Sequence, residues 1–311
     1  MREDSAGSLS PAETERVLIL DFGSQFTRLI ARRVRESGVY CEIWPFSADP
    51  AQIRSWAPRA VILSGGPASV NQPGAPLAPE AVFALGVPVL GVCYGEQLLC
   101  AQLGGAVDTP DHREYGRAFI DVTDECVLFD GVWPIGAREQ VWMSHGDRVT
   151  DLPPGFRPVA ATEGAPFAAI ADDSRRYYGL QFHPEVAHTP HGAQLLRNFT
   201  HHVAGLAGTW TMAAFRDAEI PRLRARVGSG RVICGLSGGV DSSVAALLLH
   251  EAIGEQLVCI FVDHGLLRAG EAEEVTSTFR DRFNIRLVHR DASALFLAAL
   301  DGVTEPEAKR K

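Results

Sequence analysis

Short apolar runs alternate with amphipathic segments along the first part of the chain. The apolar runs are RVLILDF (16–22), AVILSG (60–65) and VPVLGV (87–92), and the segment RLIARRVRES (28–37) has the spacing of an amphipathic helix. Continuous apolar strands of this kind are typical of a parallel sheet that helices cover on both faces. We therefore predict an α/β architecture for this part of the chain.

The pattern changes between residues 106 and 182, where short strand-like segments and turns follow one another. These segments are AFIDVTD, QVWMSHGD, PFAAIAD and YYGLQFH, and we expect them to form strands of a mixed sheet. The segment HGAQLLRNFTHHVAG then predicts a helix that closes the unit near residue 205.

Alternation restarts in the last third of the chain. A helical stretch runs from LAGTW to Gly228, and Pro221 is expected to kink or divide it. The runs RVICGL, LVCIFVD and IRLVHRD predict three more strands, separated by helical patterns. We place a domain boundary at about residue 207, with a disordered tail at 1–15, a first domain at 16–207 and a second at 208–311.

Composition narrows the possible partners. The chain has 311 residues, 46% of them hydrophobic, and a formal net charge of -9. This acidic balance argues against nucleic acid or an anionic membrane surface as a partner. The N-terminus lacks the cationic start and apolar stretch of a signal peptide, and no apolar run approaches the ~20 residues that span a bilayer. We expect a cytoplasmic protein that binds neither nucleic acid nor membrane.

The cysteines and histidines do not form a metal-binding pattern. Six cysteines occur without a C-x-x-C pair, which favours reduced thiols over a zinc site or a disulfide scaffold. Cys41, Cys234 and Cys259 lie in apolar runs and are expected to be buried. None of the ten histidines combines the helical spacing with the nearby carboxylate of a metal site, so we expect surface or core roles for them.

The first candidate catalytic residue is Cys93, in the segment VLGVCYGEQLL. It lies between a run typical of a strand and a run typical of a helix. Gly91 and Gly95 flank it two residues away on either side, as glycines do in a sharp strand-to-helix turn that lifts the central side chain from the sheet. The N-terminus of the helix and a nearby imidazolium would favour the thiolate of Cys93. A packed cysteine in a glycine-bounded turn is the alternative interpretation.

The segment GLQFHPEV (179–186) supplies a candidate base at the end of an apolar strand. Pro184 favours extended backbone at His183, and residues two apart in extended chain face the same side, so His183 and Glu185 can point into one cleft. Glu185 would orient the imidazole while His183 transfers protons. The order Cys, His, Glu disfavours an esterase or lipase, in which the acidic residue precedes the histidine.

A second candidate site follows the strand RVICGL, in the segment SGGVDSS (237–243). A strand, a loop rich in Ser and Gly, and a helix together direct backbone N–H groups towards a phosphate at the helix N-terminus. The loop has no Walker lysine, which excludes the G-x-x-x-x-G-K-[ST] class of ATPase. A glycine-rich turn that only caps a helix is the alternative.

GVCYGEQL and FHPE together resemble the class I glutamine amidotransferases, over roughly residues 15–205. In that family a cysteine thiolate attacks the glutamine carboxamide, ammonia leaves, and water releases glutamate. The resemblance implies catalytic roles for Cys93, His183 and Glu185. Glu96 departs from the apolar residue expected after CYG, which leaves the lining of the pocket open. The resemblance further implies an oxyanion hole at the backbone amides of Gly66 and Tyr94, and glutamine-binding residues Gln97, Ser144 and His145.

SGGVDSS and FVDHGLLR (261–268) resemble the ATP pyrophosphatases, which transfer AMP to a carbonyl oxygen and release pyrophosphate. The resemblance implies ATP and Mg²⁺ as cofactors, with Asp241 as a metal ligand, since a carboxylate is a hard ligand for a hard cation. The ATP-binding residues that it implies are Ser237, Gly238, Gly239, Val240, Asp241, Ser242, Ser243 and Asp263.

A class I triad followed directly by this loop resembles the glutamine-hydrolysing GMP synthetase family, which aminates XMP to GMP. The resemblance implies glutamine, ATP and XMP as substrates, a mixed, mostly parallel sheet in the first domain, and an incomplete, parallel-sheet pyrophosphatase domain after it. That family forms homodimers through a C-terminal region that also binds XMP, and the chain stops before it, so we expect a fragment. The alternatives are a truncated, noncatalytic paralogue or a stand-alone glutaminase that feeds a partner synthetase.

An incomplete second domain would leave apolar surface uncovered. The strand IRLVHRD would present an open edge, and helix faces such as SALFLAAL (293–300) would lack the elements they pack against in the complete fold.

Overall fold

The computed structural model describes residues 15–109 and 113–310. Contacts within the chain divide it into two compact units, Met1–Thr211 and Met212–Lys311. All but the last residue of the expected tail at 1–15 lies outside the described residues. Each unit is described by itself.

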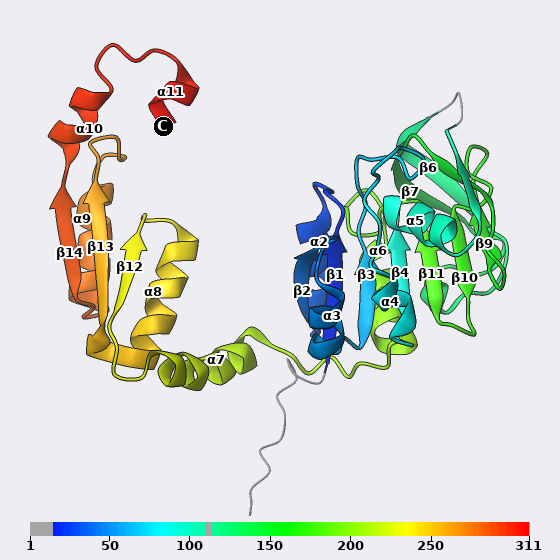
Figure 1. Cartoon of the computed structure of the whole chain (residues 1–311), viewed down its shortest axis with the longest axis horizontal. Helices are drawn as coiled ribbons and strands as arrows, with labels where there is room; N and C mark the ends of the chain where they lie inside the picture. Colours follow the sequence, from blue (N-terminus) through cyan, green and yellow to red (C-terminus); the bar gives the residue numbers. More distant parts are fainter. Residues whose placement is uncertain (1–14, 110–112, 311) are drawn as a thin grey trace, which may run out of the picture. The chain divides into compact units, whose positions relative to one another are not determined.

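The first unit is built on a nine-stranded sheet (Figure 1). The strands in sheet order are β2(Tyr40–Pro45), β1(Arg16–Asp21), β3(Ala60–Leu63), β4(Val89–Val92), β11(Tyr177–Leu180), β10(Ala169–Asp172), β9(Arg157–Ala161), β6(Glu114–Val122) and β7(Arg138–His145). The strands from β2 to β11 pair in parallel, and the remaining pairs are antiparallel. The predicted mixed α/β sheet is therefore confirmed.

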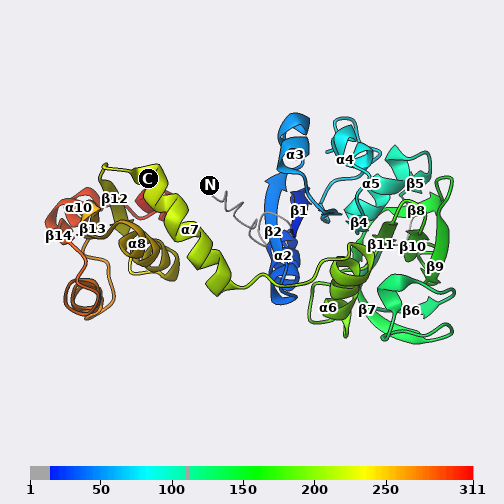
Figure 2. The same cartoon turned by 90° about the horizontal axis from the view of Figure 1, so that it is seen from below.

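Helices cover both faces of the central, parallel part of this sheet, as Figure 2 shows. Val17 and Ile19 of β1 belong to one buried cluster, and Leu18 of the same strand belongs to a second cluster. Two apolar faces on one strand account for the continuous apolar run. The first cluster contains residues of α2(Thr27–Glu36), α6(Gly192–Asn198) and the π-helical turn η2(Phe199–Val203), and the second contains residues of α3(Pro50–Trp56), α4(Glu80–Ala84) and α5(Tyr94–Gln102).

The first unit also contains a two-stranded sheet and a short 3₁₀ turn. β5(Ala106–Asp108) and β8(Arg148–Asp151) form a separate antiparallel pair, and η1(Val127–Phe129) is a short 3₁₀ turn. The expected closing helix at 191–205 is present as α6 followed by η2. His201 lies with its ring nitrogens 2.6 Å from the carbonyl oxygen of Leu206 and 3.0 Å from that of Ser37, which gives it a structural role.

The second unit has a parallel three-stranded sheet, in the order β12(Val232–Leu236), β13(Leu257–Asp263), β14(Leu287–Asp291). Its helices are α7(Met212–Val227), α8(Val240–Ile253), η3(Gly254–Gln256), α9(Glu271–Thr276), η4(Ser277–Arg282), α10(Ser293–Ala299) and α11(Pro306–Arg310). Pro221 was expected to kink or divide the helical stretch, and it does not divide it, because α7 runs through Pro221 as one helix. Ile220 and Leu223, on either side of Pro221, pack against the core of this unit and so hold the two halves in one helix.

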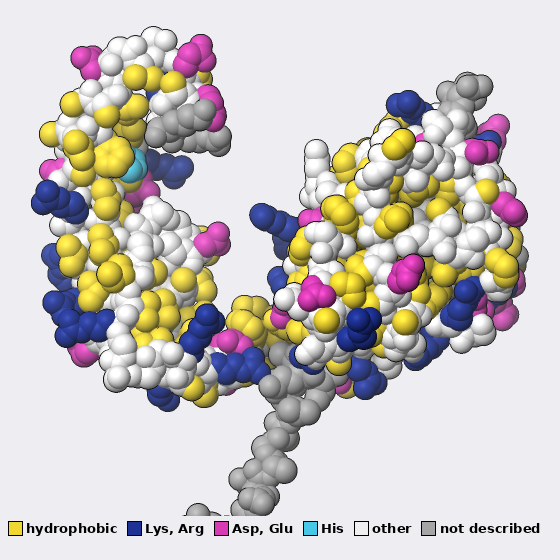
Figure 3. Space-filling model, viewed as in Figure 1, with side chains coloured by type: hydrophobic (Ala, Val, Ile, Leu, Met, Phe, Trp, Pro, Cys, Tyr) yellow, Lys and Arg dark blue, Asp and Glu magenta, His cyan; other side chains and the backbone are white. Residues whose placement is uncertain are grey.

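Apolar side chains are exposed on the second unit, as expected (Figure 3). In α10 the exposed fractions are 72% for Leu295 and 48% for Leu297. On the sheet, Ile233 is 70% exposed and Val288 is 47% exposed. The strands β12 and β14 are the two edges of the sheet among the residues described.

All six cysteines are free thiols. Cys41 and Cys259 are fully buried, as expected, whereas Cys234 is only half-buried. Across residues 15–109 and 113–310, none of the helices combines the length and the apolar character that crossing a bilayer requires.

Candidate active site

Cys93 lies at the point where β4 ends and α5 begins. Its backbone has φ +54°, a left-handed conformation that is costly for a residue with a side chain. The turn is tight on both sides, because a Cβ atom on Gly91 would lie 2.5 Å from the backbone of Gly95, and one on Gly95 would collide with the carbonyl oxygen of Leu63. The two glycines thus permit the strained turn that presents the sulfur.

His183 and Glu185 lie beside this turn in the arrangement expected from the sequence. The Nδ1 atom of His183 is 2.8 Å from Oε1 of Glu185. Both side chains are buried, with exposed fractions of 4% for His183 and 0% for Glu185. Since Nδ1 is engaged by the carboxylate, the other ring nitrogen is left to interact with the sulfur of Cys93.

The electrostatics of the three groups are coupled. Burial alone would lower the pKa of His183, but its hydrogen bonds with Cys93 and Glu185 outweigh burial and raise the pKa to about 10. A histidine with such a raised pKa is an imidazolium near neutral pH. It therefore provides a positive charge beside the sulfur and a proton for a leaving group.

The segment after β3 approaches the same point. A Cβ atom on Gly65 would lie 3.2 Å from Cε1 of His183 and 3.7 Å from Cβ of Cys93. Ser64 fixes this segment, since its hydroxyl accepts a hydrogen bond from the N–H of Phe22 at 3.0 Å and donates one to the carbonyl of Gly65 at 2.9 Å.

The two backbone amides expected to form an oxyanion hole lie on these segments. Gly66 packs so closely on Phe22 that a Cβ atom would lie 2.6 Å from its carbonyl oxygen. Tyr94 is the first residue of α5, where a backbone N–H has no acceptor within the helix. The amide of Tyr94 therefore takes no part in the hydrogen bonds within α5.

A cavity of about 890 Å³ opens in front of Cys93 and His183. Of the expected glutamine-binding residues, Gln97, Ser144 and His145 all line it, and so does Gly66. The structure thus brings Cys93, His183 and the expected residues Gly66, Gln97, Ser144 and His145 to one cavity, with Glu185 buried behind His183, whereas Tyr94 is not among the lining residues. The cavity is also lined by Asp147, the last residue of the expected pocket segment SHGD (144–147), and by Arg113, which was not among the site residues expected from the sequence.

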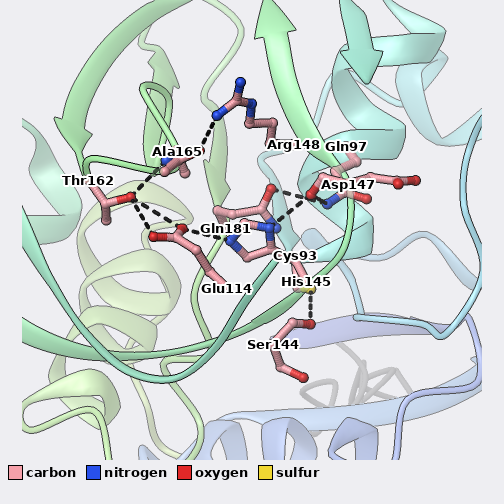
Figure 4. Close-up of polar contacts among 11 residues, drawn as sticks. Cys93, Gln97, Glu114, Ser144, His145, Asp147, Arg148, Thr162, Ala165 and Gln181 are labelled. Carbon is pink, nitrogen blue, oxygen red and sulfur yellow. Dashed lines mark hydrogen bonds and ion pairs between the residues drawn. The ribbon is translucent and has the colours of Figure 1, made fainter. Parts of the chain in front are cut away.

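A chain of hydrogen bonds forms one wall of the cavity (Figure 4). The amide of Gln97 donates to the carbonyl oxygen of Asp147 at 2.7 Å and to Oε1 of Gln181 at 3.1 Å. His145 has Nδ1 2.9 Å from the same carbonyl oxygen and Nε2 3.1 Å from the carboxylate of Glu114. The sulfur of Cys93 lies 3.5 Å from the carbonyl oxygen of Ser144. Both ring nitrogens of His145 therefore have protein partners.

Asp147 carries a carboxylate oxygen without a protein partner. Its Oδ1 accepts a hydrogen bond of 2.6 Å from the hydroxyl of Thr109, whereas Oδ2 is buried and unpaired among the described residues. A buried carboxylate oxygen without a hydrogen bond lowers the stability of the fold, unless a ligand donates a hydrogen bond to it. Asp147 is the acidic residue directly after Ser144, His145 and Gly146.

Glu96 lies away from the cavity. It is fully buried, and among the described residues neither carboxylate oxygen has a hydrogen-bond partner. A Cβ atom on Gly179 would lie 2.6 Å from Cγ of Glu96, which places this side chain beneath the sheet residues of β11. Burial, and then the nearby sulfur of Cys93, raise the pKa of Glu96 well above its ordinary value. Glu96 is therefore not part of the cavity lining.

In the second unit, the segment SGGVDSS joins β12 to the fourteen-residue helix α8. Gly238 has φ +78°, and Gly239 is the N-cap of the helix. The hydroxyl of Ser237 is 3.0 Å from that of Ser242 and accepts a hydrogen bond from the N–H of Gly239 at 3.3 Å. The loop is therefore preorganised and largely exposed, with a helix N-terminus behind it.

Three aspartates lie near this loop or at the same edge of the sheet. Asp241 is in the first turn of α8, Asp263 is the last residue of β13, and Asp291 is its partner at the end of β14. Hydrogen bonds with Ser293 lower the pKa of Asp291. Among the described residues, no three Asp, Glu, His or Cys side chains converge on a metal position. Mg²⁺ is commonly bound through one or two carboxylates together with substrate phosphates, and the carboxylate of Asp241 in the first turn of α8 fits that kind of site.

Two protein families match the chain, and their matches include both candidate sites. The glutamine amidotransferase class-I family matches residues 18–203, which include the strained turn, both segments of the cavity wall, His183 and Glu185. The chain belongs to the class I glutamine amidotransferase family. A shorter match, to the tRNA methyl transferase HUP domain, covers residues 230–284 and thus the Ser- and Gly-rich loop of this amidotransferase.

Curated relatives of the amidotransferase cover both units. It is 62% identical over 297 residues to a GMP synthase [glutamine-hydrolyzing] of Bradyrhizobium sp. (strain ORS 278), which is 96% of this chain and 56% of that protein. It is 63% identical over 300 residues to the enzyme of the same name from Phenylobacterium zucineum (strain HLK1), which is 96% of this chain and 58% of that protein. The chain thus spans little more than half the length of these relatives.

A solved structure agrees with the fold of the first unit. A protein of Thermoplasma acidophilum, assigned to one of the subunits of a GMP synthase, is 27% identical with a TM-score of 0.55. The likeness covers 66% of this chain and 97% of that one. The class I fold expected from the sequence is therefore confirmed for the amidotransferase.

Proposed function

We propose that the first unit hydrolyses the carboxamide of glutamine to glutamate and ammonia, with Cys93 as the nucleophile. One observation carries the proposal: Cys93 is held in a strained turn beside His183, whose Nδ1 lies 2.8 Å from the buried carboxylate of Glu185. Strained backbone conformations of this kind cluster at functional sites.

The proposed reaction runs in two halves. The thiolate of Cys93 attacks the carboxamide carbon, a C–S bond forms, and the negative charge moves to the carbonyl oxygen. The imidazolium of His183 gives its proton to the amide nitrogen, the C–N bond breaks, and ammonia leaves a glutamyl thioester. Water then loses a proton to His183 as it attacks the thioester, and the C–S bond breaks to release glutamate.

Fixed donors would stabilise the oxygen on which charge develops. The backbone amides of Gly66 and Tyr94 are the donors that we assign to it, because preorganised N–H groups in a water-poor site stabilise such an oxyanion most effectively. The amide of Tyr94 also lies at the N-terminus of α5, where the helix dipole favours negative charge.

Recognition of glutamine would use the charged residues of the cavity. We assign the unpaired Oδ2 of Asp147 to the α-ammonium group and the guanidinium of Arg113 to the α-carboxylate, since each is the complementary charge. Gln97, Ser144 and His145 would shape the wall between them, and the ring nitrogens of His145 would contact the protein in place of the substrate.

Release of glutamate by the purified chain tests this proposal. The Cys93→Ala variant should lose glutamine hydrolysis, whereas Cys100→Ala should retain it. Cys100 is a matched control because it is a buried thiol on the helix α5, which follows Cys93, and it does not line the cavity. Hydrolysis by Cys93→Ala at the wild-type rate would contradict the proposal.

For the protein as a whole, we propose glutamine-dependent amination of XMP to GMP, with cleavage of ATP to AMP and pyrophosphate. The identity of 62% to a relative named GMP synthase [glutamine-hydrolyzing] supports it. Backbone amides of residues 237–243 would hold the ATP phosphates, with Asp263 near the nucleotide. Asp241 would hold Mg²⁺, which supplies charge neutralisation on the phosphates when bound. We also propose that the protein is cytoplasmic and that it forms a homodimer. The six free thiols are in keeping with a reducing compartment such as the cytoplasm.

A further inference from the structure

The ring of Phe26 packs against the imidazole of His183. The two ring centroids lie 5.5 Å apart and the ring planes meet at 71°, which is an edge-to-face contact. Aromatic rings favour this arrangement, because the positive edge of one ring meets the negative face of the other. Phe26 is half-buried and lines the cavity in front of Cys93, as His183 does.

The imidazole cannot rely on the sulfur of Cys93 for its orientation. The proposed reaction converts this sulfur into a thioester, which removes its hydrogen bond with His183 while the ring still has to take a proton from water. The hydrogen bond of 2.8 Å between Nδ1 and Glu185 then fixes one ring atom. The torsion about the bond from Cβ to the ring is broad in histidine, so the ring plane can tilt unless it is packed. The packing comes from the backbone at Gly65, where a Cβ atom would lie 3.2 Å from Cε1, and from the ring of Phe26.

The segment that carries Phe26 is fixed by its own hydrogen bonds. The carboxylate of Asp21, at the end of β1, accepts the N–H of Gly23 at 2.9 Å and the hydroxyl of Thr27 at 2.7 Å. The hydroxyl of Ser24 accepts the N–H of Phe26 at 3.0 Å, and Phe26 is the N-cap residue of α2. The backbone of Phe26 is therefore held in place, and its ring offers the imidazole a fixed surface.

The helix α2 contacts the proposed triad at a second point. Arg33 lies seven residues after Phe26, which is two helical turns and therefore the same side of the helix. Its Nε atom donates a hydrogen bond of 3.2 Å to the carbonyl oxygen of Glu185. Ile30 of the same helix is fully buried in the first apolar cluster, which holds the helix against the sheet. One anchored helix thus contacts both His183 and Glu185.

We propose that Phe26 is a positioning residue for His183, which holds the imidazole in the plane that directs Nε2 towards the sulfur of Cys93. The inference rests on the proposed glutaminase function. Both proton transfers of that reaction need the ring in one orientation. A tilted ring keeps its hydrogen bond with Glu185 but directs Nε2 away from the reacting atoms.

Phe26→Leu tests the proposal, because it removes the ring and keeps an apolar side chain. We expect kcat for glutamine hydrolysis to fall roughly tenfold with a much smaller change in KM, as for a misplaced catalytic group. Phe26→Tyr keeps the ring and should retain most of kcat. A rise in KM at unchanged kcat would overturn the proposal, since Phe26 would then serve as a wall for glutamine.

Phe83→Leu is the matched control. Phe83 is a half-buried residue of the same unit and also has an aromatic contact, with a centroid distance of 6.2 Å to Tyr177, but it does not line the cavity. Its variant should keep the wild-type kcat and KM. An equal fall of kcat in Phe83→Leu would count against the proposal, because loss of any ring would then have the same effect.

A measurement without glutamine separates the inference from turnover. Carbon NMR relaxation of histidine-labelled protein reports how freely the Cε1–H bond of His183 moves, once its signal is assigned through His183→Gln. The order parameter of this bond should fall in Phe26→Leu and keep its wild-type value in Phe83→Leu. Equal order parameters in all three proteins would overturn the inference even if the wild type hydrolyses glutamine. Absence of hydrolysis by the wild type would instead overturn the proposed function itself.

Discussion

The hydroxyl of Thr189 donates a hydrogen bond of 2.7 Å to the carbonyl oxygen of His183. The same hydroxyl accepts a hydrogen bond of 3.0 Å from the N–H of Trp142, and the N–H of His183 donates to the carbonyl of Trp142 at 3.0 Å. Thr189 is 4% exposed. A single buried hydroxyl thus ties the segment of the base to β7.

Thr189→Val should lower kcat for glutamine hydrolysis, because it leaves the carbonyl of His183 and the N–H of Trp142 without this partner. We expect a loss of stability of about 1–3 kcal/mol, the usual cost of unpaired buried polar groups. Thr189→Ser keeps the hydroxyl and should retain most of the activity. Equal activity of the valine and serine variants, measured at matched folded fraction, would argue against this role.

Glu96 should make the fold less stable as the pH rises. Burial raises the pKa of Glu96 in the folded state, so above about 4.3, the usual value for glutamate, the unfolded chain loses a proton that the folded chain keeps. Stability is then lost with increasing pH until the folded carboxyl itself ionises. Glu96→Gln should flatten this slope in urea unfolding measured across the pH range, and an unchanged slope would contradict the assignment.

Glu96→Leu should raise stability near neutral pH, because it replaces two unpaired buried oxygens with apolar atoms. The expected gain is about 1–3 kcal/mol. Glutamine hydrolysis should be retained, since Glu96 does not line the cavity. A less stable variant would indicate that the carboxyl has a partner in solution.

Glu185→Gln should shift the pH dependence of glutamine hydrolysis. Hydrogen bonds with Cys93 and Glu185 outweigh burial and hold the pKa of His183 at about 10 in the folded chain. Glutamine in place of Glu185 keeps an acceptor for Nδ1 but removes the charge. The fall of kcat/KM on the alkaline side should therefore move to lower pH.

The same variant has a consequence for stability. A raised histidine pKa stabilises the fold fully below about 6.5, the unfolded value, and this contribution is lost as the pH rises towards the folded value. Unfolding free energies of the wild type should thus fall over that alkaline window more than those of Glu185→Gln. Parallel profiles for the two proteins would contradict the coupling.

Asp241→Asn should weaken binding of ATP in the presence of Mg²⁺ by about tenfold, as expected when a charged contact of about 1.5–3 kcal/mol is lost. Chelation of Mg²⁺ should weaken binding to the wild type and have little further effect on the variant. Glu251→Gln, which removes a carboxylate from the last turn of the same helix α8, serves as the control. Equal sensitivity to chelation in all three proteins would exclude Asp241 as a ligand.

The sequence pattern was sufficient for the strands of the parallel region. The run at 16–22 contains β1, and the helix expected at 28–37 lies within one residue of α2. Apolar side chains on both faces of a strand give a local pattern, which can be recognised without knowing which strands pair with one another. The helix α3 was missed although Asp49 and Pro50 are a typical helix start, and Asp49 does cap it through the N–H of Ala51 at 2.8 Å.

The residues alone predicted the site where its chemistry is local, whereas Gly66, Gln97, Ser144 and His145, which line the cavity, were expected only from the family resemblance. The turn around Cys93 and the pair His183 and Glu185 each lie within a few residues of sequence. Glu114 could not be connected with His145, because their contact depends on the register of β6 and β7, which the sequence does not specify at thirty-one residues' separation. The continuity of α7 through Pro221 likewise depends on packing against distant residues.

Covalent labelling of the chain by glutamine tests the central claim most directly. Rapid mixing with glutamine, an acid quench and peptide mass spectrometry should find one glutamyl group as a thioester on the peptide that contains Cys93. None should appear on the other five cysteines or in the Cys93→Ala variant. A glutamyl group on a different cysteine, or hydrolysis of glutamine by Cys93→Ala, would contradict the account.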